Sequence, residues 1–103
     1  MTDTNSFDQQ VVLITAAASG LGRGIAIDLA RHGATVHVWD RDAQALAELS
    51  SDAKSENLAI STRAVDLSNE REVEQAFSAT IEQSSKIDVL INNAGGSLHT
   101  PFN

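Results

Sequence analysis

The feature that most constrains the fold of this chain is the alternation of short apolar runs with longer amphipathic segments. A short continuous apolar run is typical of a strand buried on both faces, whereas apolar residues three or four positions apart are typical of a helix. We expect strands at residues 11–14, 35–39, 58–65 and 87–91, separated by helices at about 20–32, 43–55 and 69–84. This order of elements, with short connections, predicts an α/β fold with a parallel sheet and right-handed crossovers.

Capping residues and apolar stripes support the three expected helices. Asp42 is a candidate N-cap of the second helix, and Ser68 or Asn69 of the third. The residues expected to face the sheet are Leu21, Ile25 and Leu29 in the first helix, Leu46, Leu49 and Ala53 in the second, and Val73, Ala76, Phe77 and Ile81 in the third. We expect His32 at the end of the first helix and His37 on the surface of a strand.

The chain of 103 residues is long enough for one small domain, and no repeat or linker divides it. Residues 1–9 are expected to form a polar N-terminal tail, and residues 10–103 a partial Rossmann-type, doubly wound domain. Its first four strands would take the order 3-2-1-4, with the third helix on the face opposite to the other two. Because no closing element follows the fourth strand, we interpret the domain as truncated before its catalytic half. An apolar edge strand then predicts a marginal or aggregation-prone chain.

Composition and charge exclude several classes of function. The formal net charge is −7, from 14 acidic and 7 basic residues, and no stretch is locally basic, which argues against nucleic acid and anionic membranes as partners. The absence of cysteine excludes disulfides, thiolate catalysis and cysteine metal sites, and we expect no metal site. The sequence has neither the layout of a signal peptide nor an apolar run that spans a bilayer, so we expect a cytoplasmic protein.

A loop of small residues at positions 15–22 joins the first expected strand to the first helix. A pyrophosphate requires backbone N–H donors at a helix N-terminus and no side chains in the way. Gly20 and Gly22 supply that clearance, although Ile25 stands where the common G-x-G-x-x-G pattern has its third glycine. The loop favours a nucleotide site, and the alternative is a turn that only lets the helix pack closely on the strand.

Acidic residues end the second and third expected strands. Asp40 follows Gly20 by 20 positions, where a carboxylate can accept hydrogen bonds from the adenosine ribose and repel a 2′-phosphate. The neighbouring Arg41 argues weakly the other way, because it could pair with a 2′-phosphate. Asp66 and Leu67 stand where an adenine ring would lie. The alternative for both aspartates is a turn or the start of a helix, and the combination with the glycine loop favours a dinucleotide.

Together these motifs resemble those of the classical short-chain dehydrogenase/reductase family. The family's T-G-x-x-x-G-x-G loop is similar to residues 15–22, with Ala16 in place of its first glycine. Its N-N-A-G signature stands at residues 92–95, and its Asp before an apolar residue at residues 66–67. The resemblance implies cofactor binding by Thr15, Ser19, Gly20, Leu21, Gly22, Asp40, Arg41, Asp66, Leu67, Asn93, Ala94 and Gly95.

The resemblance also implies an activity, the interconversion of an alcohol and a carbonyl by hydride transfer. It favours NAD over NADP, because Ser19 stands where NADP-preferring members often carry a basic residue. The family's catalytic Tyr-x-x-x-Lys has no counterpart here, since the sequence holds no tyrosine. We therefore assign no catalytic residue and expect the 103-residue chain alone to be inactive. A small-molecule alcohol or ketone substrate and a homo-oligomer are implied for the intact protein.

Two other interpretations of the sequence remain open at this point. One is a stand-alone nucleotide-binding or regulatory module, and the other is part of a methyltransferase that binds S-adenosylmethionine, against which the signature at residues 92–95 argues.

A methyl group at Ala16 would cost roughly 1 kcal/mol if that position needs a positive φ, and almost nothing otherwise. Trp39, which precedes Asp40, is expected to sense the binding of adenosine.

Overall fold

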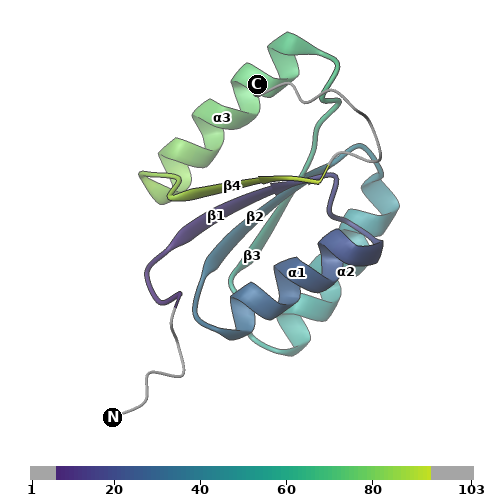
Figure 1. Cartoon of the computed structure of the whole chain (residues 1–103). Helices are drawn as coiled ribbons and strands as arrows, with labels where there is room; N and C mark the ends of the chain where they lie inside the picture. Colours follow the sequence, from purple (N-terminus) through teal and green to yellow (C-terminus); the bar gives the residue numbers. More distant parts are fainter. Residues whose placement is uncertain (1–6, 94–103) are drawn as a thin grey trace.

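Four parallel strands and three helices alternate along the chain in the computed structural model, which describes residues 7–93. The elements are β1 Val11–Thr15, α1 Gly20–Arg31, β2 Thr35–Asp40, α2 Ala43–Ser55, β3 Ile60–Ala64, α3 Glu70–Ser84 and β4 Val89–Asn92. The strand order is β3-β2-β1-β4. Helices α1 and α2 cover one face of the sheet and α3 covers the other (Figure 1). The predicted Rossmann-type α/β fold and its strand order are confirmed.

The apolar run of β1 is continuous because this strand lies inside the sheet, between β2 and β4. All five of its residues are buried. Val12 and Ile14 belong to the larger core cluster beneath α1 and α2, whereas Leu13 belongs to a second cluster with Trp39 beneath α3. The edge of the Trp39 ring packs on Phe77 of α3, with ring centroids 5.2 Å apart and planes at 85°. A strand covered on both faces is expected to be almost continuously apolar, and Val11–Ile14 follow this pattern.

The face that α1 presents to the sheet differs from the predicted stripe. Its buried residues are Gly22, Ala26 and Ala30. Leu21 is 77% exposed, and the predicted Ile25 and Leu29 lie half-buried along the flanks of that face. Small side chains let the helix backbone approach the sheet closely, so the shape of the contact outweighs the hydrophobicity of single residues.

Two further expectations, on the burial of residues between the sheet and α3, are wrong. Ala76 and Thr80 are the buried residues of α3, while the predicted Ile81 is 43% exposed. His37 is not on the surface but 3% exposed, because strand alternation places it on the same face as Trp39. Its Nε2 lies 2.7 Å from the Ser84 hydroxyl at the end of α3. Burial lowers the pKa of His37, and the nearby charge of Arg63 lowers it further.

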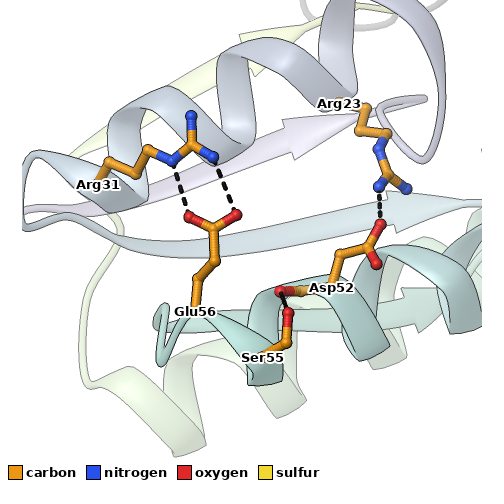
Figure 2. Close-up of polar contacts among 5 residues, drawn as sticks. All are labelled: Arg23, Arg31, Asp52, Ser55 and Glu56. Carbon is orange, nitrogen blue, oxygen red and sulfur yellow. Dashed lines mark hydrogen bonds and ion pairs between the residues drawn. The ribbon is translucent and has the colours of Figure 1, made fainter.

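The two helices on the same face are tied together by charged side chains (Figure 2). Arg31 of α1 forms a two-pronged pair with Glu56, just after α2, with N–O distances of 3.0 and 2.9 Å. Near the other end of α1, Arg23 pairs with Asp52 of α2. The capping residues are Asp42 for α2, as predicted, and Asn69 rather than Ser68 for α3. The two ion pairs hold α1 against α2, and the two caps mark where α2 and α3 begin.

The ends of the described region add two observations. Phe7 lies within the segment expected to be a tail, yet it packs against the larger core cluster, and its N–H donates to the His32 carbonyl at 3.2 Å. No helix within residues 7–93 has the length and apolarity needed to cross a bilayer.

Candidate functional site

A cleft of about 410 Å³ opens where the carboxyl ends of β1, β2 and β3 meet. Parallel strands place the residues that follow them along the same edge of the sheet, which is where ligands bind in open α/β folds. The residues that line the cleft are Ala16, Asp40, Arg41, Val65, Asp66, Leu67 and Ser68. The structure thus brings together four predicted site residues, namely Asp40, Arg41, Asp66 and Leu67.

The N-terminus of α1, beside this cleft, is left open to a ligand. Ser19 is its N-cap in extended conformation, but the Ser19 side chain makes no capping hydrogen bond, and the first turn holds no acidic residue. By contrast, Asp42 accepts from Ala45 N–H at the start of α2, and Asn69 accepts from Glu72 N–H at the start of α3. Within residues 7–93 no side chain therefore caps the first N–H groups of α1, and an anion would satisfy them.

The structure favours glycine at both loop positions, for different reasons. A β-carbon on Gly22 would collide with the Asn93 side chain and stand 2.9 Å from the Ala17 Cα. Gly20 has open space around it, but its φ is +63°, a conformation that costs other residues free energy. Leu21, between them, extends into solvent. The clearance that the sequence predicted for this loop is present.

Residues at the end of β4 hold the loop between β1 and α1 in place through hydrogen bonds. Asn93 donates from its backbone N–H to the Thr15 carbonyl at 3.2 Å and from Nδ2 to the Ala16 carbonyl at 3.0 Å. The buried Thr15 hydroxyl donates to Asn92 Oδ1 at 2.8 Å, so it is directed into the protein rather than toward the cleft. These contacts join β1 to β4 at the point where the loop leaves the sheet. The predicted site residues Ala94 and Gly95 lie outside the described residues.

The Asp40 carboxylate is held in place by backbone donors. Its Oδ2 accepts from the Ala18 N–H at 3.0 Å, and its Oδ1 accepts from the Asp42 N–H at 2.9 Å. Each carboxylate oxygen can accept a second hydrogen bond, so two acceptor positions remain. The two oxygens of one carboxylate can accept from two hydroxyl groups on neighbouring carbon atoms. The contact from Ala18 was not predicted, because nothing in the sequence shows which loop N–H reaches the end of β2.

The far side of the cleft is formed by the turn after β3. Asp66 Oδ1 accepts from the backbone N–H and the hydroxyl of Ser68, at 3.0 and 2.7 Å. These bonds, helped by the charge of Arg41, lower the pKa of Asp66 below its ordinary value. Leu67 is half-buried, whereas Arg41 is exposed, and no ion pair engages Arg41 within residues 7–93. This part of the cleft therefore combines the apolar side chain of Leu67 with the negative charge of Asp66 and the positive charge of Arg41.

The glycine of the family loop that is replaced by Ala16 did need a positive φ. Ala16 has φ +55°, its N–H donates to the Trp39 carbonyl at 2.7 Å, and it lines the cleft. Its methyl group therefore carries the cost of roughly 1 kcal/mol expected for this conformation.

The Trp39 side chain is buried beneath α3, so it does not line the cleft and would sense a ligand only indirectly. Within residues 7–93 no cluster of three acidic or histidine side chains is placed to hold a metal ion.

The geometry agrees with what sequence comparison finds. The family profile described as short chain dehydrogenase matches residues 10–103, which is nearly the whole chain. The chain belongs to the short-chain dehydrogenase family. Members of this family are oxidoreductases, and the match sets aside the methyltransferase interpretation.

Individual relatives support the assignment over most of the chain. The chain is 37% identical to a 1,6-dihydroxycyclohexa-2,4-diene-1-carboxylate dehydrogenase of Acinetobacter baylyi over 98 residues, covering 95% of this chain and 37% of that protein. The crystal structure of NAD+-bound xylitol dehydrogenase is 27% identical with a TM-score of 0.82, covering 87% of this chain and 35% of the other. A structure of actinorhodin polyketide ketoreductase with NADPH is 32% identical with a TM-score of 0.80, covering 84% and 33%. The chain spans about a third of the length of these relatives.

Proposed function

We propose that the cleft binds the adenosine half of NAD(H), as part of an enzyme that interconverts an alcohol and a carbonyl by hydride transfer. The observation that carries this proposal is the Asp40 carboxylate, which the Ala18 and Asp42 N–H groups hold at the wall of the cleft. Its two remaining acceptor positions suit the two free hydroxyls of an adenosine ribose. A 2′-phosphate in place of one hydroxyl would meet the negative charge of Asp40.

The rest of the site suits the neighbouring parts of the same cofactor. The uncapped N-terminus of α1 offers N–H donors to a pyrophosphate, and Gly22 allows it to approach. The apolar surface of Leu67, beside Asp66, suits an adenine ring. Among the solved relatives, one holds NAD+ and another NADPH, so the preference for NAD rests on Asp40 and Ser19 of this chain.

The chemical step needs residues that this sequence does not contain. The nicotinamide ring of a bound cofactor would accept or supply the hydride, and a side chain must exchange a proton with the substrate oxygen. The 103 residues include no tyrosine, so we assign no catalytic residue to them. We propose that residues 10–103 supply the cofactor-binding part of a larger catalytic domain, whose intact form is a cytoplasmic homo-oligomer acting on a small alcohol or ketone. The chain alone is then expected to bind cofactor without turning over substrate.

Calorimetric titration of the 103-residue chain with NADH and with NADPH tests the cofactor assignment. We expect NADH to bind at least about tenfold more tightly, the factor that corresponds to roughly 1.4 kcal/mol. Asp40→Ser should weaken NADH binding by about a hundredfold or more and narrow the difference between the two cofactors, because two hydrogen bonds to a charged group, each contributing roughly 1.5–3 kcal/mol, are lost.

Asp28→Ser is the matched control, because it removes a carboxylate from the exposed side of α1 outside the cleft. A sample that melts cooperatively but binds neither dinucleotide would contradict the proposal. Equal effects of the two substitutions would show that net charge, rather than the Asp40 contacts, controls binding.

A further inference from the structure

We propose that Ala16 is a specificity-determining residue, whose methyl group narrows the cleft beside Asp40 and so disfavours a dinucleotide with a 2′-phosphate. The inference rests on the proposed function, since it concerns how the same cleft distinguishes two cofactors. It assigns to Ala16 a role separate from the charge of Asp40. The two effects can be measured independently.

The sheet order places Ala16 next to Asp40. The cleft runs along the strand ends from β1, which Ala16 follows, past Asp40 at the end of β2, to residues 65–68 after β3. The Ala16 N–H donates to the carbonyl of Trp39, the residue before Asp40, at 2.7 Å. The Asp40 carboxylate in turn accepts from Ala18 N–H at 3.0 Å. Ala16 is therefore the loop residue that bounds the end of the cleft near the Asp40 carboxylate.

The surface that Ala16 contributes to this end is apolar. Its N–H is bonded to the Trp39 carbonyl, and its own carbonyl accepts from Asn93 Nδ2 at 3.0 Å. Both polar backbone atoms are thus engaged, and we infer that the half-buried residue lines the cleft with its Cα and methyl group. The positive φ of +55° is a conformation that glycine would adopt without strain. Glycine at this position would therefore keep the loop path and enlarge the cleft by one methyl group.

A ribose with free hydroxyls and one with a 2′-phosphate differ in what they require here. The free hydroxyls need only the acceptors of Asp40, whereas the phosphate adds bulk and a charge of about −1.5 to −2 that must avoid the carboxylate. Arg41 on the cleft wall, which forms no ion pair with the described residues, could neutralise a phosphate that had room to reach it. Two barriers therefore oppose the phosphate, the charge of Asp40 and the bulk of Ala16.

Four proteins separate these barriers: the parent chain, Ala16→Gly, Asp40→Ser and the double variant. The measured quantity is the ratio of the dissociation constants for NADPH and NADH, obtained by calorimetry for each protein. A change in loop flexibility affects both cofactors alike and cancels in the ratio. We expect Ala16→Gly to lower the ratio by about threefold in the parent and about tenfold in the Asp40→Ser background, where charge no longer dominates.

Ala17→Gly provides the matched control for the same loop. Ala17 is fully buried and does not line the cleft, so its replacement should leave the ratio unchanged. If Ala16→Gly alters the binding of both cofactors by the same factor in both backgrounds, Ala16 affects only loop order and the inference is wrong. Failure of the folded parent to bind either cofactor would overturn the proposed function and this inference with it. Parent binding with an unchanged ratio would overturn the inference alone.

Discussion

At the scale of single residues, the loop between β1 and α1 shows how a site depends on where side chains are missing. Gly22 lies against Asn93 and Ala17, so no β-carbon fits there. Gly24, two residues further along α1, has no neighbour within 4 Å of the place where a β-carbon would be. The two glycines belong to the same helix and differ only in their tertiary surroundings.

Replacing each glycine with alanine tests this difference. Gly22→Ala should lower the free energy of unfolding by roughly 1–3 kcal/mol, because a crowded backbone must shift. It should also weaken NADH binding, because the loop moves away from α1. Gly24→Ala should be neutral or stabilising by about 0.5–1 kcal/mol, since alanine favours the helix. Urea denaturation of both variants provides the measurement, and equal effects would show that the contact with Asn93 does not constrain the loop.

At the scale of elements, β2 and α3 are joined by a buried polar contact that the proposed function does not use. His37 of β2 lies 2.7 Å from the Ser84 hydroxyl at the end of α3, a helix whose buried residues are Ala76 and Thr80. Burial lowers the pKa of His37 in the folded state below the ordinary value of 6.5. The unfolded chain therefore binds a proton at this residue at a higher pH than the folded chain does.

This contact predicts a pH dependence of stability with a definite sign. Above pH 6.5 His37 is neutral in both states, and as pH falls below 6.5 the unfolded state gains a proton first, so the free energy of unfolding should decrease. His37→Gln should flatten the dependence between about pH 6.5 and 5, where His37 titrates in the unfolded chain. Urea denaturation at several pH values measures this, and an unchanged slope in the variant would contradict it. Losses from Asp66 and Asp88, whose pKa values are also lowered, should begin only near their ordinary value of 3.8.

At the scale of the whole molecule, the sheet is well covered in its centre, and β3 and β4 form its two edges within residues 7–93. Within residues 7–93, β4 pairs only with β1. Leu90 of β4 is 37% exposed, and its neighbours Val89 and Ile91 are half-buried. An apolar edge strand with free backbone groups favours pairing with another chain.

We therefore expect the isolated 103-residue chain to self-associate in a concentration-dependent manner. Leu90→Lys should reduce the association, because a charged side chain on an edge strand opposes pairing. Leu21→Lys, which replaces an even more exposed leucine on α1, is the matched control and should have less effect. Sedimentation velocity distinguishes these cases. A monodisperse parent with a sharp cooperative melt would show that β4 does not drive association.

Much of the architecture could be predicted because it depends on neighbours along the chain. Hydrophobic period, turn residues and caps are local, and they correctly predicted the seven elements and the cap Asp42. The strand order was predicted from the topology of a doubly wound sheet, and it is confirmed. Strand boundaries were less accurate, and the third strand was expected at residues 58–65 but spans Ile60–Ala64. It lies at an edge of the sheet and is only partly buried, so its apolar pattern marks the ends less sharply.

By itself the sequence determined the fold class and indicated that Asp40, Arg41, Asp66 and Leu67 lie at one edge of the sheet, because parallel strands necessarily place their carboxyl ends there. Only the tertiary structure decided which face of α1 is buried, where His37 lies and which φ Ala16 adopts. Each of these depends on residues distant in sequence. His37 meets Ser84 across 47 positions, and the Ala16 carbonyl meets Asn93 across 77. Local periodicity does not reveal such distant partners. The buried position of His37 and the positive φ of Ala16 could therefore be identified only in the folded structure.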